Sequence, residues 1–355
     1  MPVALASIRH NGKRERGKTR SACKGGLLKI PKRALIRNGN AFFGPDEDDR
    51  KDRAAGRKSG DKAGMLDFIQ QLVSGIALGC IYGLIALGFV LIYKTTEVVN
   101  FAQGELLMLG GFFAFTFIAL MGLNYWIGFF LAVVCMAAFG ALSERFVLRP
   151  VLGSPQFSII MATIGVSYFL RSIAGMIWGT DDLKIDTPFS TGVLRIGDLV
   201  LAHDKLSVIV ATAILCTVLW LFFTKTQIGT AMRATSENML AAYYMGIPVK
   251  MVVALTWAIS AAVAACAGVL LAPITFIHSN VGLALALKAF PAAVLGGFGS
   301  IPGAVVGGII IGVIENMAGF YLAQGWKDVA PHIVLLTMLL LKPEGLFGHV
   351  GRKKV

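Results

Sequence analysis

The chain has 355 residues, of which 56% are apolar and 15% charged, and its mean hydropathy is +0.71. Residues 1–64 carry 17 Lys and Arg against 7 Asp and Glu, whereas the rest of the chain carries 16 against 13, so the net charge of +13 describes mainly the N-terminal part. The rest contains several apolar runs of about 20 residues, the length that a helix needs to cross a bilayer. This excludes a protein with a single membrane anchor and an outer-membrane barrel, whose strands alternate polar and apolar residues.

Residues 1–64 have the composition of a disordered basic extension, with few aromatic residues and an acidic patch, PDEDDRKD. Within them GKRERGKT, residues 12–19, matches the spacing of a phosphate-binding P-loop. A P-loop needs a buried strand before it and a helix after it, and neither is indicated here, so we interpret the match as coincidence. Since MLDFIQQLVSG leads from Met65 into the first apolar run, we interpret residues 1–64 as a translated upstream sequence; the alternative is a genuine basic tail.

Nine apolar segments follow, and together they predict an all-α integral membrane protein with eight or nine transmembrane helices in residues 65–355. The second segment is rich in glycine, and Lys288 and Pro291 interrupt the seventh, so one or two segments are expected to be broken or re-entrant. The segments are residues 68–93, 101–121, 126–148, 157–178, 205–223, 251–277, 281–298, 303–323 and 329–341.

Basic residues predict the orientation, because cytoplasmic loops are enriched in Lys and Arg. Arg145 and Arg149 follow the third segment, Lys225 and Arg233 follow the fifth, and further basic residues end the chain. We expect these three regions to face the cytoplasm. The more acidic loop at residues 179–205 is expected to face outward.

Glycines recur at intervals of four in the first and eighth segments, which places them on one helix face. In lipid, small residues let helix backbones approach closely, so we favour a packing role for them over a pore-lining one. The glycines in question are Gly75, Gly79, Gly83, Gly303, Gly307 and Gly312.

The longest polar interruption on the expected cytoplasmic side is TKTQIGTAMRATSENMLAAYYMGIPVK. Its centre, Arg233 to Met245, predicts one short amphipathic helix lying along the membrane, ended by Gly246 and Pro248. Such a helix would present a surface to another protein. A mere linker, the alternative, would not need a capped helix.

Ionisable residues within apolar segments are functional candidates, because a charge in hydrocarbon costs at least ~2.5 kcal/mol. We favour mutual salt bridges that fix the bundle. In the alternative, Arg171 or Lys288 meets a substrate carboxylate, or Asn100 and Gln103 line the passage. Cysteines and histidines are scattered without metal-ligand spacing, so no metal or catalytic centre is expected. The four ionisable candidates are Glu105, Arg171, Lys288 and Glu315.

Several motifs resemble those of a known family. GTAMRATSENMLAAYYMGI is similar to the cytoplasmic coupling loop of ABC-transporter permeases. VVNFAQGELLMLGGF, AFPAAVLGGFGSIPGAVVGGIIIGVIEN and LLLKPEGLFG resemble signatures of the branched-chain amino acid permease subunits. The resemblance covers Met65 to Gly348, and residues 1–64 have no counterpart in it. Gln103 stands where many relatives have histidine, which argues against a histidine-based titration role.

The resemblance implies the permease subunit of a binding-protein-dependent importer in the bacterial inner membrane, with no enzymatic activity or cofactor of its own. Its implied partners are a second related permease subunit, two ABC ATPase subunits that hydrolyse the ATP, a periplasmic substrate-binding protein and membrane lipid. No nucleic-acid partner is expected, because most of the basic charge belongs to residues 1–64. A urea or short-chain amide permease of the same family and an ion-coupled secondary transporter are the alternatives. The positions implied to couple to the ATPase are Gly229, Arg233, Ala234, Glu237, Ala241 and Gly246.

Overall fold

The computed structural model describes residues 47–151, 153–185, 187–188, 192–196, 199–323 and 325–348. The segment that matches a P-loop, residues 12–19, therefore lies outside the described residues, as does most of the N-terminal extension. Backbone contacts divide the chain into two units, Met1–Gly56 and Arg57–Val355. In the first unit, the described residues 47–56 are helical. All features discussed below belong to the second unit.

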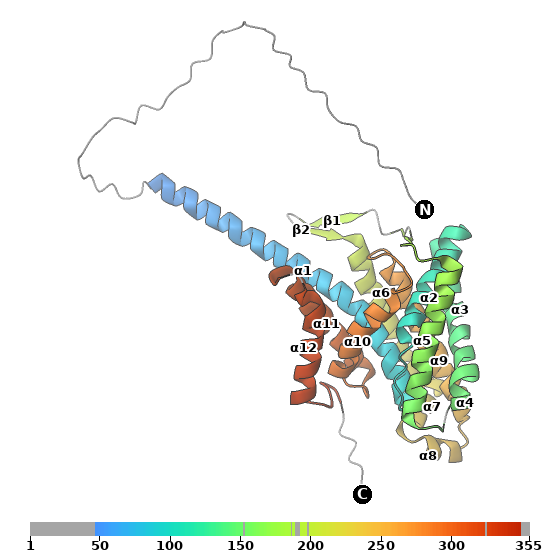
Figure 1. The fold of residues 1–355 in the computed structure, drawn as a ribbon. Helices are drawn as coiled ribbons and strands as arrows, with labels where there is room; N and C mark the ends of the chain where they lie inside the picture. Colours follow the sequence, from blue (N-terminus) through green and yellow to red (C-terminus); the bar gives the residue numbers. More distant parts are fainter. Residues whose placement is uncertain are drawn as a thin grey trace, which may run out of the picture. The chain divides into compact units, whose positions relative to one another are not determined.

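Helices make up most of the second unit, as predicted, and every one of the nine apolar segments is helical (Figure 1). Among the described residues, seven helical stretches are long and apolar enough to cross a membrane. The elements are α1 (Glu47–Thr96), α2 (Gln103–Phe115), the π-helix η1 (Thr116–Leu120), α3 (Tyr125–Ser143), the π-helix η2 (Glu144–Leu148), α4 (Arg149–Val151), α5 (Gln156–Trp178), β1 (Val193–Ile196), β2 (Leu199–Ala202), α6 (His203–Lys225), α7 (Gln227–Glu237), α8 (Met239–Tyr244), α9 (Val249–Leu271), α10 (Val281–Gly296), α11 (Ile301–Tyr321) and α12 (Trp326–Leu341).

Two of the nine predicted crossings, at residues 281–298 and 329–341, correspond to shorter helices. These are α10 and α12, each of 16 residues. At 1.5 Å per residue such a helix is about 24 Å long, which is less than the ~30 Å hydrocarbon layer. The helix α10 continues through Lys288 and Pro291. This segment is therefore short but is not broken at either residue. The glycine-rich second segment is irregular in another way, because α2 passes into the π-helix η1.

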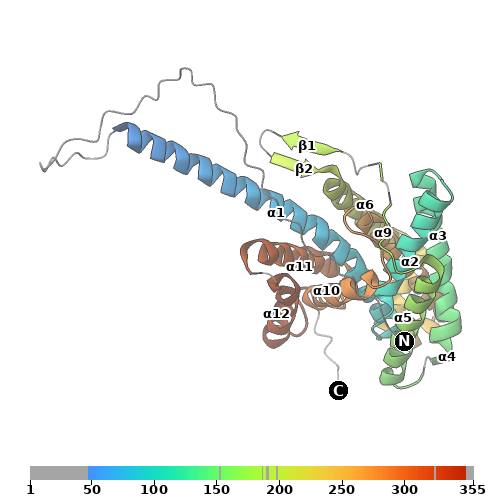
Figure 2. The same cartoon turned by 45° about the horizontal axis from the view of Figure 1, so that its top comes forward.

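The membrane part of α1 forms the centre of the bundle. In its most apolar 18-residue window 89% of the residues are buried, compared with 22% in the windows of α3 and α6. Ile81, Leu84 and Ile85 of α1 are inaccessible to solvent. In both views this part of α1 lies between α10–α12 on one side and α2, α3, α5 and α9 on the other (Figures 1 and 2). The sparsely buried helices α3, α5 and α6 form the outside.

Glycines bring α1 and α11 into backbone contact. A Cβ atom on Gly79 would lie 2.6 Å from Ile309 Cα, and one on Gly75 would lie 2.8 Å from Val313 Cα. From the other side, a Cβ on Gly312 would overlap the backbone of Gly79. Gly303 and Gly307 approach α10 in the same way, at Gly296 and Ala292. These contacts are the close helix packing that small residues permit in lipid.

The loop expected to face outward contains a short antiparallel hairpin, in which Val193 pairs with Ala202 and Ile196 with Leu199. The pair of strands was not predicted from the sequence. Its two apolar tetrapeptides, VLRI and LVLA, are separated by Gly-Asp, a turn signal between β-compatible runs. A separate antiparallel bridge between Leu183 and Ile277 ties the same loop to the segment before α10.

Candidate translocation and coupling sites

A buried ion pair joins α2 to α5. The Glu105 side chain, in the first turn of α2, is 1% exposed, and its Oε1 accepts hydrogen bonds from the Arg171 guanidinium and, at 3.1 Å, from the Ser167 hydroxyl. Ser167 and Arg171 are four residues apart on α5, so they lie on one helix face. The guanidinium also lies 5.4 Å from the ring centre of Tyr168. Glu105 Oε2 and Arg171 Nε have no hydrogen-bond partner among the described residues.

A second charged cluster joins α10, α11 and α12. Lys288 Nζ lies 2.9 Å from Glu315 Oε1 and 2.7 Å from Asp328 Oδ1. The two acids differ in environment, because the Glu315 side chain is 1% exposed and that of Asp328 is 73% exposed. Asp328 is in the first turn of α12, outside the seven spanning stretches, and its pKa is lowered by the hydrogen bond and the charge of Lys288. The four charged candidates therefore form two clusters, and Asp328 is a member that sequence reasoning missed.

Asn100 and Gln103 are buried and hold the turn before α2 in place. The Ser260 hydroxyl of α9 lies 3.0 Å from Gln103 Oε1 and 3.0 Å from the Gly88 carbonyl oxygen. Asn100 Oδ1 accepts a hydrogen bond from the backbone N–H of Ala102 at 3.0 Å. Both side chains are at most 1% exposed in this conformation.

The connector between α6 and α9 contains two helices and not the single helix predicted from Arg233 to Met245. The chain bends at Asn238, which has φ −155° and ψ 102°, and the Asn238 side chain caps α8 by accepting from Ala241 N at 2.9 Å. Asparagine competes with the helix for backbone N–H groups, which explains the break. The predicted end is confirmed, because Gly246 has φ 83°, in the left-handed region that glycine tolerates.

The helix α7 is fixed to the end of α6. The Thr226 hydroxyl caps α7 by accepting from Gly229 N at 3.0 Å. Gly229 is buried, and a Cβ on it would overlap the backbone of Phe222 and Phe223. The Arg233 guanidinium donates to the Phe223 carbonyl oxygen. Thus two of the six predicted coupling positions contact α6 directly.

The other predicted coupling positions lie closer to solvent. Glu237, Ala241 and Gly246 are exposed, and Ala234 is half-buried. Beside them α8 and the residue that follows it expose five large apolar or aromatic side chains, all within MLAAYYM, a surface that sequence reasoning did not predict. These are Met239, Leu240, Tyr243, Tyr244 and Met245, of which Met245 is 83% exposed.

Comparison with known proteins identifies the family. Residues 71–341 match the family model described as "Branched-chain amino acid transport system / permease component". The chain is 36% identical to the "High-affinity branched-chain amino acid transport system permease protein LivH" of Escherichia coli (strain K12), over 82% of this chain and 98% of the relative. It is 34% identical to the corresponding protein BraD of Pseudomonas aeruginosa, over 81% of this chain and 98% of the relative.

The chain is also similar to a more distant relative and to a solved structure. The chain is 30% identical to the "Probable branched-chain amino acid transport permease protein LivH" of Methanocaldococcus jannaschii, over 75% of this chain and 88% of the relative. Among solved structures, "PsaBC from Streptococcus pneumoniae in complex with Fab" matches 78% of this chain and 92% of its own, with a TM-score of 0.43 and 16% identity, too distant to inform the fold. The chain thus belongs to the family of permease components of branched-chain amino acid transport systems, as a multi-pass membrane transport subunit and not an enzyme.

Proposed function

We propose that this chain pairs with a second related permease subunit to form the path by which branched-chain amino acids cross the bacterial inner membrane. Two ABC ATPase subunits drive the movement, and a periplasmic substrate-binding protein delivers the substrate. The substrate class rests on the relatives, which are named as branched-chain amino acid permeases. The observation that carries the ATP-driven mechanism is the exposed face of α8 on the expected cytoplasmic side.

That face has the composition of a docking site. Tyr243, Tyr244 and Met245 are each at least 66% exposed, and aromatic residues and methionine are enriched in protein interfaces. Tyr243 also lines a shallow groove of about 600 Å³, together with Met239 and Leu240 of α8 and Pro248, Val249 and Lys250 at the start of α9. An aromatic side chain from an ATPase subunit could occupy part of this groove as an anchor.

The contacts between α6 and α7 supply a route for the movement. A push on α8 reaches α7 through the bend at Asn238, and α7 is bound to α6 through Gly229 and Arg233. Because α6 is a spanning helix with little buried surface, it can shift at low cost relative to α1 and α9. We therefore assign Gly229 and Arg233 to transmission within the permease, and Glu237, Ala241 and Gly246 to the docking surface, with Ala234 at its edge.

The charged clusters support the bundle and are candidates for the path. Each connects helices that would have to move relative to one another when the permease opens: α2 with α5, and α10 with α11 and α12. Arg171 Nε and Glu105 Oε2 keep unused hydrogen-bonding capacity in the described structure. An amino acid offers a carboxylate and an ammonium group, which match that capacity when the pair separates.

The test uses the assembled transporter in proteoliposomes. A Tyr243→Ala/Tyr244→Ala variant is expected to lose most ATPase binding and ATP-driven leucine uptake, while Tyr321→Ala, at an exposed tyrosine at the end of α11, retains both. Unchanged uptake by the double variant would refute the docking assignment. Concentrative uptake by this chain alone on an ion gradient would instead favour a secondary transporter. Transport of urea or short amides in place of leucine would favour the other permeases of the family.

A further inference from the structure

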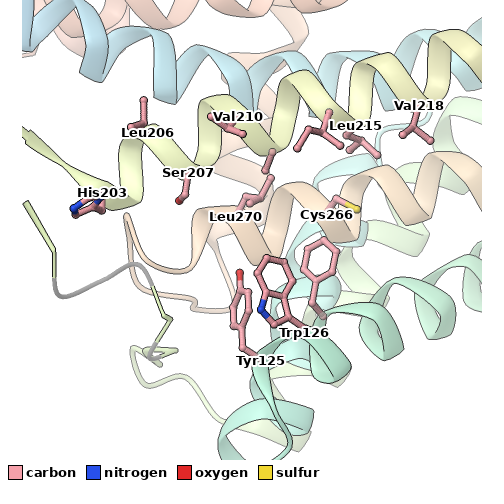
Figure 3. Close-up of a pocket in the computed structure, with 13 residues that line it drawn as sticks. Tyr125, Trp126, His203, Leu206, Ser207, Val210, Leu215, Val218, Cys266 and Leu270 are labelled. Carbon is pink, nitrogen blue, oxygen red and sulfur yellow. The ribbon is translucent and has the colours of Figure 1, made fainter. Parts of the chain in front are cut away.

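An apolar groove of about 510 Å³ separates α6 from α3 and α9, and the proposed transport mechanism does not use it (Figure 3). Trp126 and Phe129 of α3 line one wall, Val210 and Ile214 of α6 line the other, and Cys266 of α9 lies on the floor. Several of these side chains are exposed in the bundle, including Trp126, Val210 and Ile214.

The groove lies at membrane depth. Both α3 and α6 belong to stretches long and apolar enough to span the bilayer. The buried residues of α6 form one narrow stripe, and many of its other residues are exposed. The stripe consists of Val208, Thr212, Leu219 and Phe223. Space between two spanning helices has to be filled by apolar atoms, because water is excluded from the hydrocarbon layer.

The lining changes in polarity along its length. His203 and Ser207 lie at one end of α6, near the start of α3, while Leu215 and Val218 lie at the other end (Figure 3). The Tyr125 side chain points its hydroxyl towards α6 at the polar end. Tyrosine and tryptophan at one end are typical of the membrane–water interface. The predicted orientation puts this end at the outer surface, because residues 179–205 precede α6.

The length of the apolar part matches one leaflet. From Ser207 to Val218 the helix rises about 16 Å, at 1.5 Å per residue, and half of the hydrocarbon layer is about 15 Å. An amino acid is unsuited to the groove, because its two charges would find no partner along the apolar walls.

We propose that this groove is a binding site for one acyl chain of a phospholipid from the outer leaflet. The acyl chain lies along α6 between Ser207 and Val218, and the glycerol and head group lie at the His203 end. The bound lipid fills the gap between α6 and the pair α3 and α9, so that α6 moves against a fluid surface. The proposal is independent of the ATPase surface on α8.

The test is photo-crosslinking of the purified full chain from membranes containing phosphatidylethanolamine with a diazirine in one acyl chain. Crosslinks are expected to concentrate on the groove side of α6 and on α3, and to be lost in Ala211→Trp, which fills the groove. The matched control Ala138→Trp, at an exposed position of α3 that does not line the groove, leaves them unchanged. Even labelling around α6, or labelling that Ala211→Trp does not reduce, would overturn the proposal.

Two further measurements keep the proposal falsifiable if Ala211→Trp fails to fold. Native mass spectrometry of the wild-type chain in detergent is expected to retain one phospholipid per chain after delipidating washes, and complete loss of lipid would contradict the site. Crosslinking in the assembled transporter is expected to match that of the chain alone. Disappearance of the crosslinks on assembly would show that a protein partner covers the groove.

Discussion

The guanidinium of Arg233 donates a hydrogen bond to the backbone carbonyl oxygen of Phe223, ten residues earlier in the chain. The last carbonyl groups of a helix lack partners within it, and Phe223 is in the last turn of α6. Arg233 therefore satisfies an end group of the spanning helix and fixes α7 to it. In the proposed mechanism, a movement of α7 is transmitted to α6 through this contact and through the packing of Gly229.

Arg233→Met is expected to weaken coupling while leaving the ATPase bound. It removes a charged hydrogen bond worth about 1.5–3 kcal/mol but keeps most of the side-chain stem. ATP hydrolysed per leucine imported in proteoliposomes measures the effect, and should rise. Arg233→Lys should restore part of the coupling, and Arg145→Met, at another exposed arginine on the expected cytoplasmic side, serves as the control. Loss of ATPase binding in Arg233→Met would instead place Arg233 on the docking surface.

We expect the effect of a substitution at Gly246 on uptake to depend on backbone strain and not on steric overlap with neighbouring atoms. Gly246 has φ 83°, and no atom lies within 4 Å of a Cβ built on it. A β-branched residue there costs about 1–2 kcal/mol and displaces the end of α8, whereas asparagine tolerates this conformation. Gly246→Val should reduce ATP-driven uptake, and Gly246→Asn should retain it. Gly299→Val, at an equally open position without a positive φ, is the control; equal losses in Gly246→Val and Gly246→Asn would contradict the strain argument.

Gly312→Ala is expected to destabilise the bundle, because the added methyl group overlaps the backbone of Gly79. Overpacking of this kind costs about 1–3 kcal/mol. Thermal unfolding of the purified chain in detergent is the measurement. Gly165→Ala is the matched control, because Gly165 is also within a spanning helix but has no atom within 4 Å of its Cβ position. Similar melting temperatures for the two variants would argue against a tight contact between α1 and α11.

The pair of Glu105 and Arg171 is expected to show strong energetic coupling. Removing one partner leaves a buried charge uncompensated, which costs about 3–5 kcal/mol. Arg171→Met and Glu105→Gln should each lower the melting temperature, and the double variant should lose much less than the sum of the two. Strictly additive losses would mean that the ion pair does not contribute to stability. Leucine uptake by the stable double variant then separates a packing role from a role in the path.

The two acids that contact Lys288 provide a comparison within one cluster. Asp328→Asn should cost at most about 1 kcal/mol, as is usual for an exposed ion pair. Lys288→Met should cost several times more, because it leaves Glu315 buried without its cation. Melting temperatures of the two variants measure the difference. Lys288 lowers the pKa of Asp328. The small stabilisation from this ion pair is therefore fully present at a pH above the ordinary pKa of Asp, and it is lost as the pH falls through the lowered pKa of Asp328.

The amino-acid sequence by itself determined the class of the protein and the position of every apolar helix. Runs of apolar residues are decisive in a bilayer, because only a helix satisfies its own backbone groups in lipid. Local signals also located the end of α8, since Gly246 is followed by Pro248. The motifs between Met65 and Gly348 pointed to the family that the comparisons establish.

Only the tertiary structure decided which distant residues meet. Glu105 pairs with Arg171 across 66 positions, and Lys288 reaches Asp328 across 40, separations at which sequence spacing carries no information on contact. The break at Asn238 was missed because helix propensity is similar on both sides of it, and a single side-chain cap decides the outcome. The burial of Gly229 and the groove beside α6 depend on how whole helices pack, which follows from shape complementarity between surfaces and not from any local pattern.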